Sequence, residues 1–222
     1  MTDDPLSVPY RERERSVTLE PLGTDDELHH ELLTLNMGPH HPATHGVLRL
    51  LTTLEGEVVR DIKPIIGYLH TGIEKSCEDQ QYWKVITFVE RMDYLAYYFN
   101  ATAYCMSVEK LLEEEVPARA EYLRVAHMEL NRIASHLFAL ATGALDLGAV
   151  TMLWWGCRDR DLVLDLFEMS SGQRMHPRYI QVGGVIEDIP PGWEKKVREF
   201  LAMMPTRLDQ YEDLLDRNEI WL

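Results

Sequence analysis

Residues 118–142 read ARAEYLRVAHMELNRIASHLFALAT, and this stretch decides the fold of the larger part of the chain. Its apolar residues recur every three or four positions, as on one face of an α-helix. They are Leu123, Ala126, Leu130, Ile133, Leu137 and Leu140. Pro117 precedes the stretch, and proline is favoured at a helix start because its missing N–H would be unpaired there anyway. The pattern predicts an amphipathic helix, in which His127 and His136 are packing or surface residues.

Three further segments repeat apolar or aromatic residues at helical spacing. They span residues 77–113, 150–171 and 193–215. TGALDLGAV at 142–150 carries two glycines and is expected to end the first helix. GQRMHPRYIQVGGVIEDIPPG at 172–192 is rich in glycine and proline, which is typical of a loop. The pattern predicts a helical bundle over residues 73–222.

The residues upstream form strand-like runs that are rich in leucine and β-branched residues. These runs are ELLTLNM at 31–37, VLRLLTTL at 47–54 and EVVRDIKPII at 57–66. Glycine at the join Glu55-Gly56 predicts a hairpin, and Pro64 predicts an edge strand or a strand end. We therefore expect a small antiparallel sheet over residues 31–72, and a loose arm over the charged, apolar-poor residues 1–30. A sheet followed by a bundle is an α+β fold.

The composition narrows the function classes. The 222 residues carry a net charge of -15, which argues against nucleic-acid binding because phosphates require a basic face. There is no run of about 18 apolar residues, and the polar N-terminus lacks the apolar stretch of a secretory signal. We therefore expect a cytoplasmic protein, or one held peripherally on a membrane complex. Cys77, Cys105 and Cys157 are isolated, which predicts reduced thiols and no iron–sulfur or zinc site held by this chain alone.

Three histidines crowd the glycine-proline stretch GPHHPATHGVLRLL at 38–51. They are His40, His41 and His45. Their spacing matches no helical zinc motif, and the two prolines of the stretch are expected to exclude a helix. Metal ligation, proton transfer at a bound ligand and a solvated loop all stay open as explanations, and we favour proton transfer because histidine titrates near neutral pH.

Other candidate residues lie in the helical part. In FVERMDYLAYY at 88–98, Arg91 and Tyr94 are three residues apart and would share a helix face, the alternative being an ion-paired surface arginine and a core tyrosine. Asp146 lies among leucines and glycines, so it is expected to be partly buried with a partner such as histidine, or else to cap a helix. His176 lies in a loop, where it is a site residue or an ordinary surface histidine.

Seven segments, in this order, resemble the D-type subunit of proton-pumping NADH–quinone oxidoreductase, respiratory complex I, which is the quinone-site subunit of the peripheral arm. They are GPHHPATHGVLRL, IGYLHTGIEK, ERMDYL, ELNRIASHL, LDLGA, SGQRMHPRYIQVGGV and NEIW. Most members of that family read GPQHPSTHGVLRL in the first segment, where this chain has His40 and Ala43, and paired phenylalanines where it has Trp154-Trp155. The resemblance extends from about residue 31 to 222, and because members continue for a comparable length, we expect the chain to be the N-terminal portion.

The resemblance implies a quinone-reduction site. In the family, the equivalents of His45 and Tyr94 hold the quinone head group, and the equivalent of Asp146 is the partner of the histidine. His41 is implied as a further quinone-binding residue. The implied substrate is a quinone such as ubiquinone or menaquinone, and the implied activity is electron transport coupled to proton translocation, carried out only within the complex.

The resemblance also implies partners and a location. Arg91 and His176 are expected near the terminal iron–sulfur cluster, which a neighbouring subunit carries, so this chain itself holds no cofactor and no metal. A membrane-arm subunit with the quinone channel is a second implied partner, and the location is peripheral, on the cytoplasmic side of the cell membrane. NADH is expected to react elsewhere, because no GxGxxG follows a strand.

Two alternatives stay open. One is a non-catalytic assembly scaffold. The other is a relative of the large subunit of nickel–iron hydrogenases, whose bundle the family shares. That subunit has a cysteine pair where this chain reads ERMDYL at 90–95, so the nickel site would be missing.

Overall fold

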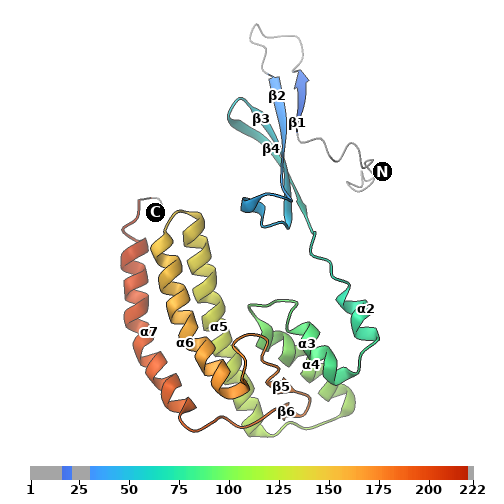
Figure 1. Cartoon of the computed structure of the whole chain (residues 1–222), viewed down its shortest axis with the longest axis vertical. Helices are drawn as coiled ribbons and strands as arrows, with labels where there is room; N and C mark the ends of the chain where they lie inside the picture. Colours follow the sequence, from blue (N-terminus) through green and yellow to red (C-terminus); the bar gives the residue numbers. More distant parts are fainter. Residues whose placement is uncertain (1–16, 22–30, 220–222) are drawn as a thin grey trace. The chain divides into compact units, whose positions relative to one another are not determined.

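The computed structural model describes residues 17–21 and 31–219 of the chain, which divides into two compact units (Figure 1). The first unit is Met1–Ile73 and the second is Glu74–Leu222. The first holds the sheet and the second holds the long helices, so the expected α+β fold is confirmed. Among the residues described, no helix is both long and apolar enough to cross a membrane.

The sheet of the first unit consists of antiparallel strands in the order β1-β2-β3-β4. The strands are β1 (Val17–Pro21), β2 (Glu31–Met37), β3 (Leu48–Glu55) and β4 (Val58–Ile66). The predicted hairpin is present between β3 and β4, with Gly56 in the turn at φ 60°. Pro64 lies on the outermost described strand, as predicted, where its missing N–H breaks no inner ladder.

β1 lies within the segment that was expected to be a loose arm. It pairs with β2 from Val17 opposite Leu35 to Pro21 opposite Glu31, so the expectation is wrong for these five residues. Alternation of Val17, Leu19 and Pro21 with polar residues is a weak strand signal that the charged surroundings obscured. The rest of that arm, residues 1–16 and 22–30, lies outside the described residues.

The second unit is built from six helices and a short hairpin in its described part. They are α2 (Ile73–Glu78), α3 (Tyr82–Val89), α4 (Tyr97–Leu112), α5 (Ala118–Asp146), α6 (Val150–Ser171), β5 (Ile180–Gln181), β6 (Gly184–Val185) and α7 (Trp193–Leu215). The bounds of α6 and α7 agree with the predicted ones. α5 continues four residues further than predicted, because Gly143 is accommodated inside it and the chain turns only at Gly148, at φ 90°.

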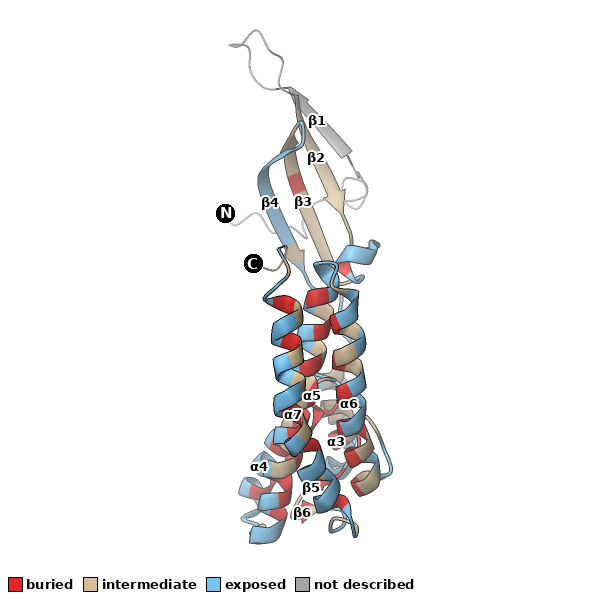
Figure 2. Cartoon of the chain, turned by 90° about the vertical axis from the view of Figure 1, so that its left-hand side faces the viewer, coloured by how far each residue is buried: buried red, intermediate tan, exposed pale blue. Residues whose placement is uncertain are grey.

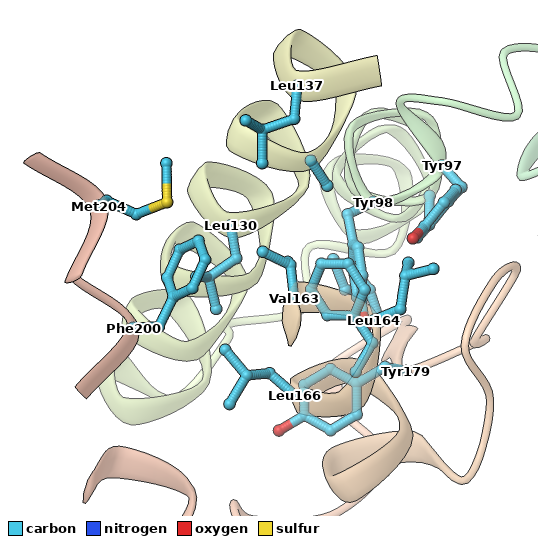
Figure 3. Packing of buried hydrophobic residues seen from close by; sticks show 14 of the residues in the cluster. Tyr97, Tyr98, Leu130, Leu137, Val163, Leu164, Leu166, Tyr179, Phe200 and Met204 are labelled. Carbon is cyan, nitrogen blue, oxygen red and sulfur yellow. The ribbon is translucent and has the colours of Figure 1, made fainter. Parts of the chain in front are cut away.

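The core of the second unit lies where α4, α5, α6 and α7 meet. Figure 3 shows Tyr97 and Tyr98 of α4 directed towards the side chains of α6 and the loop after it, with Phe200 of α7 near α5. The buried positions follow the inner faces of the long helices (Figure 2). Gly156 sets the spacing of α5 and α6, because an added Cβ would lie 2.8 Å from Cβ of Ala141.

His127 is part of this core, as the sequence indicated. Its ring lies 4.3 Å from that of Tyr179 and 5.1 Å from that of Trp193, between centroids. Nδ1 is 2.9 Å from the carbonyl oxygen of Leu123, and Nε2 is 2.9 Å from Oγ of Ser170. Burial lowers the pKa of the imidazole to about 4, so the ring is neutral at physiological pH.

Candidate functional site

The histidine loop of the first unit is shaped by Gly38 and Thr44. Gly38 has φ 84°, and a Cβ there would lie 2.2 Å from the carbonyl oxygen of Leu48, so only glycine fits. The buried hydroxyl of Thr44 lies 3.2 Å from the carbonyl oxygen of Pro39 and 3.0 Å from that of His41. The residues Pro42–Thr44 form one turn of 3-10 helix, so the expectation that prolines exclude all helix here is wrong. Proline is tolerated because it lies in the first turn.

The three histidines of this loop differ in what they contact. Nδ1 of His41 accepts a hydrogen bond from the N–H of Ala43 at 3.1 Å, so this ring caps the turn. His45 ends the turn with a left-handed backbone, at φ 52° and ψ 22°. All three side chains are exposed, and in the described part of the chain the rings of His40 and His45 make no hydrogen bond. His45 is therefore held at its main chain while its imidazole stays available.

Arg91 and Tyr94 do not share a helix face, contrary to the prediction. α3 ends at Val89, and residues 90–96 form turns before α4 begins. Asp93 causes the break, because its side chain accepts from the N–H of Leu95 at 3.2 Å and so competes with helical hydrogen bonding.

The alternatives for this pair are also wrong. Tyr94 is 60% exposed and is not a core residue. The exposed guanidinium of Arg91 donates to the carbonyl oxygen of Thr87, and no carboxylate of the described residues lies within ion-pair distance of it. Both side chains therefore present polar groups at the surface of the second unit, as ligand-binding residues would.

Asp146 is the last residue of α5 and is exposed. Neither expectation for it holds: it is not partly buried, and it caps no helix start, since α6 follows Ala149. The apolar neighbours that suggested burial, Leu145 and Leu147, are themselves 37% and 49% exposed. The carboxylate is thus open to solvent.

The structure separates Asp146 from Tyr94 along α5. The carbonyl oxygen of Leu95 accepts from Nδ2 of Asn131 at 2.9 Å, which anchors the Tyr94 segment halfway along α5. Asp146 lies fifteen residues further on, about 22 Å at 1.5 Å per residue. One quinone ring does not reach both residues.

Arg91 and His176 lie close together in the second unit. The loop after α6 returns to the end of α3, where Nδ1 of His176 lies 3.1 Å from the carbonyl oxygen of Glu90. Burial and then the positive charge of Arg91 hold the pKa of the His176 imidazole below its usual value. The neutral ring is favoured at this place.

Glu90 is a residue of this place that sequence reasoning missed. Its side chain is 1% exposed, and Oε1 accepts from the N–H of Arg178 at 2.9 Å, while the buried Oε2 has no partner among the described residues. Burial raises the pKa of its carboxyl group to about 7, against the opposing effects of that hydrogen bond and of Arg91 and Arg178. The available signal was its position four residues after the apolar Ile86, which places it just beyond the end of α3 on the same side as Ile86.

Known proteins resemble this chain along most of its length. A family model described as "Respiratory-chain NADH dehydrogenase, 49 Kd subunit" matches residues 146–222. The D-type subunit of NADH-quinone oxidoreductase from Rhodococcus jostii is 57% identical over 86% of this chain and 44% of its own length. The corresponding protein of Acidothermus cellulolyticus is 53% identical over 87% of this chain and 44% of its own length. The second such protein of Chloroflexus aurantiacus is 51% identical over 86% of this chain and 47% of its own length. The chain spans less than half the length of these relatives.

Proposed function

We propose, from the premise that this chain belongs to the family of D-type subunits of NADH-quinone oxidoreductase, that it forms part of the quinone-reduction site of respiratory complex I. The observation that carries the proposal is the histidine loop, whose main chain is fixed by Gly38 and Thr44, while the ring of His45 is exposed and makes no hydrogen bond to any described residue. A ring held in this way needs little reorganisation to bind a ligand.

The chemistry of the exposed groups suits a quinone. Reduction of a quinone to a quinol takes up two electrons and two protons. An imidazole N–H, as in His45, and a phenol, as in Tyr94, can each donate a hydrogen bond to a carbonyl oxygen and can each pass a proton to it. We assign His41 a supporting role, since its Nδ1 is engaged by the loop and only Nε2 remains for a ligand.

Asp146 acts, in this proposal, through His45 and not on the quinone. Its distance from Tyr94 along α5 argues against direct contact with the same ring. An exposed carboxylate favours the charged form of a histidine beside it and fixes the orientation of the ring. This pairing of Asp146 with His45 rests on the family resemblance, in which the equivalent residues are partners.

Electrons reach the quinone, we propose, from an iron–sulfur cluster of a neighbouring subunit beside Arg91 and His176. The described residues of this chain do not fit a cluster of their own, since no three His, Cys, Asp or Glu side chains gather in them. The positive charge of Arg91 favours a reduced, more negative centre nearby. The chain would act peripherally on the cytoplasmic side of the membrane, next to the membrane-arm subunit with the quinone channel, with proton translocation as the coupled step.

Two rates test this proposal in membranes that contain the assembled complex. Tyr94→Phe removes the phenol donor, and we expect NADH-to-quinone electron transfer to fall by up to about tenfold, with a larger loss in His45→Ala. NADH-to-ferricyanide transfer should stay at the parental rate, and His40→Ala, in the same loop, should leave both rates unchanged. Parental quinone rates in both variants would refute the assignment, and a parallel fall of both rates with complex content would favour the scaffold role.

A further inference from the structure

Glu90 contacts the loop of His176 at two points, through its main-chain carbonyl oxygen and through a carboxyl oxygen. Its carbonyl oxygen is 3.1 Å from Nδ1 of His176, and its Oε1 accepts from the N–H of Arg178 at 2.9 Å. A carbonyl oxygen only accepts, so Nδ1 carries the hydrogen and Nε2 is left with its lone pair. Both the place and the tautomer of the ring therefore depend on one residue at the end of α3.

The turn His176–Arg178, which Glu90 contacts, has a strained main chain. His176 and Arg178 have φ of 54° and 50°, a left-handed conformation that side chains other than glycine disfavour. The ring of Tyr97 lies edge-on to His176 at 5.6 Å between centroids, and the guanidinium of Arg178 lies over the ring of Trp83 at 5.2 Å. Those contacts reach side chains, whereas the carboxyl group of Glu90 holds the main chain of the strained turn.

We propose that Glu90 is a positioning residue, whose carboxyl group holds the strained His176–Arg178 turn so that the His176 ring is fixed in one tautomer beside Arg91. The contacts of Glu90 with this turn lie within the second unit. The use of the oriented ring next to an iron–sulfur cluster rests on the proposed function.

The carboxyl group of Glu90 is a second titratable group at the His176 turn, besides the imidazole of His176. Its Oε2 is buried without a partner among the described residues, which favours the protonated acid, and burial raises its pKa to about 7. In the described part of the chain, the charged or titratable groups that interact with it are Arg91, Tyr97, Tyr98, Cys105 and Arg178, in addition to His176. Loss of the proton at neutral pH would strengthen the hydrogen bond that the carboxyl group accepts from the N–H of Arg178. Because that bond holds the turn of His176, the ring of His176 should report the protonation state of Glu90.

Nuclear magnetic resonance of the whole chain, labelled with ¹³C and ¹⁵N in histidine, tests the proposal. The ring signals of His176 are assigned from their loss in His176→Gln. In the parent we expect an Nδ1–H tautomer and two titration steps, one of them near the pKa of about 7 of Glu90. Glu90→Gln keeps an oxygen acceptor for the turn, so it should keep the tautomer and lose that step. Glu121→Gln, the same change at an exposed position of α5, should titrate like the parent.

Removing the acceptor gives the second measurement. Glu90→Ala keeps the main-chain carbonyl that His176 contacts but removes the side-chain acceptor of the Arg178 N–H. We expect the released turn to move the His176 ring away from that carbonyl, which gives mixed tautomers, and tryptic cleavage after Arg178 to be up to about tenfold faster, the effect of losing one hydrogen bond on local opening. Two titration steps in Glu90→Gln, or a single tautomer with parental cleavage in Glu90→Ala, would overturn the proposal. If Glu90→Ala does not fold, the titration of Glu90→Gln decides alone. Neither quinone nor a partner subunit is used, so a failure here is distinct from a failure of the quinone-site assignment.

Discussion

The stability of the second unit should be nearly independent of pH between about pH 5 and pH 7, because two buried groups titrate there with opposite effects. The folded state keeps His127 neutral down to a pKa of about 4, whereas the unfolded imidazole takes up a proton at its ordinary 6.5. Acidification therefore favours unfolding through His127. Glu90 acts in reverse, since its folded carboxyl group holds a proton up to about 7 and the unfolded one only up to 4.5. Acidification favours folding through Glu90.

The two effects are similar in size. A pKa that differs by one between the folded and unfolded states corresponds to about 1.4 kcal/mol of stability. The pKa of each of these two groups differs by roughly 2.5 between the two states. Between pH 7 and pH 5 the binding equilibria give a loss of about 2 kcal/mol from His127 and a gain of about 2 kcal/mol from Glu90. The parent therefore shows almost no slope, and each single variant should uncover the slope of the other group.

Urea unfolding followed by far-ultraviolet circular dichroism, which the helices of the second unit dominate, measures these slopes. His127→Gln should lose stability on going from pH 5 to pH 7, and Glu90→Gln should gain it, by about 2 kcal/mol each. The lowered pKa of the His176 imidazole makes acidification favour unfolding, as His127 does, so it adds to the slope of Glu90→Gln and opposes the slope of His127→Gln. Slopes of the same sign in the two variants, or a variant as flat as the parent, would refute the reasoning.

Two further changes test single contacts in the fold. Gly38→Ala should destabilise the first unit by about 1–3 kcal/mol, because alanine would have to adopt φ 84° with its Cβ against a main-chain carbonyl. Gly143→Ala, in open space inside α5, should stabilise the second unit by about 0.5–1 kcal/mol. Thermal melting measures both changes, and an unchanged melting temperature of Gly38→Ala would contradict the geometry. Arg124→Met should cost about 3–5 kcal/mol in urea unfolding because it leaves the buried carboxylate of Glu109 without its 2.5 Å partner. Arg119→Met, which breaks an exposed ion pair, should cost much less. Equal costs for the two arginines would show that burial does not decide the value of these pairs.

The sequence predicted the elements well wherever hydrophobic spacing and turn residues agreed. The hairpin at Gly56, the edge strand with Pro64 and the bounds of α6 and α7 are examples. Periodicity failed at residues 90–96, because apolar spacing continues through them while the side chain of Asp93 bonds to the main chain and breaks the helix.

The candidate site was harder to predict than the fold, for physical reasons. Sequence patterns alone could not show that Arg91 and His176 lie close together. His176 contacts Glu90, the neighbour of Arg91, and these two residues are 86 positions apart in the chain. Asp146 was expected to be buried from its apolar neighbours, but a helix end exposes neighbours as well. Glu90 was missed because a carboxylate at the end of a short helix is usually exposed, and the loop that covers this one comes from 86 residues further along the chain.

The close approach of α5 and α6 at Gly156 has a mechanical consequence. With no side chain between them there, the two helices share a dense contact that resists bending. α6 joins the turn after Asp146 to the loop of His176, a length of about 33 Å for its 22 residues. We therefore expect α5 and α6 to move as one rigid body, so that a displacement at the Asp146 end would also shift the loop of His176.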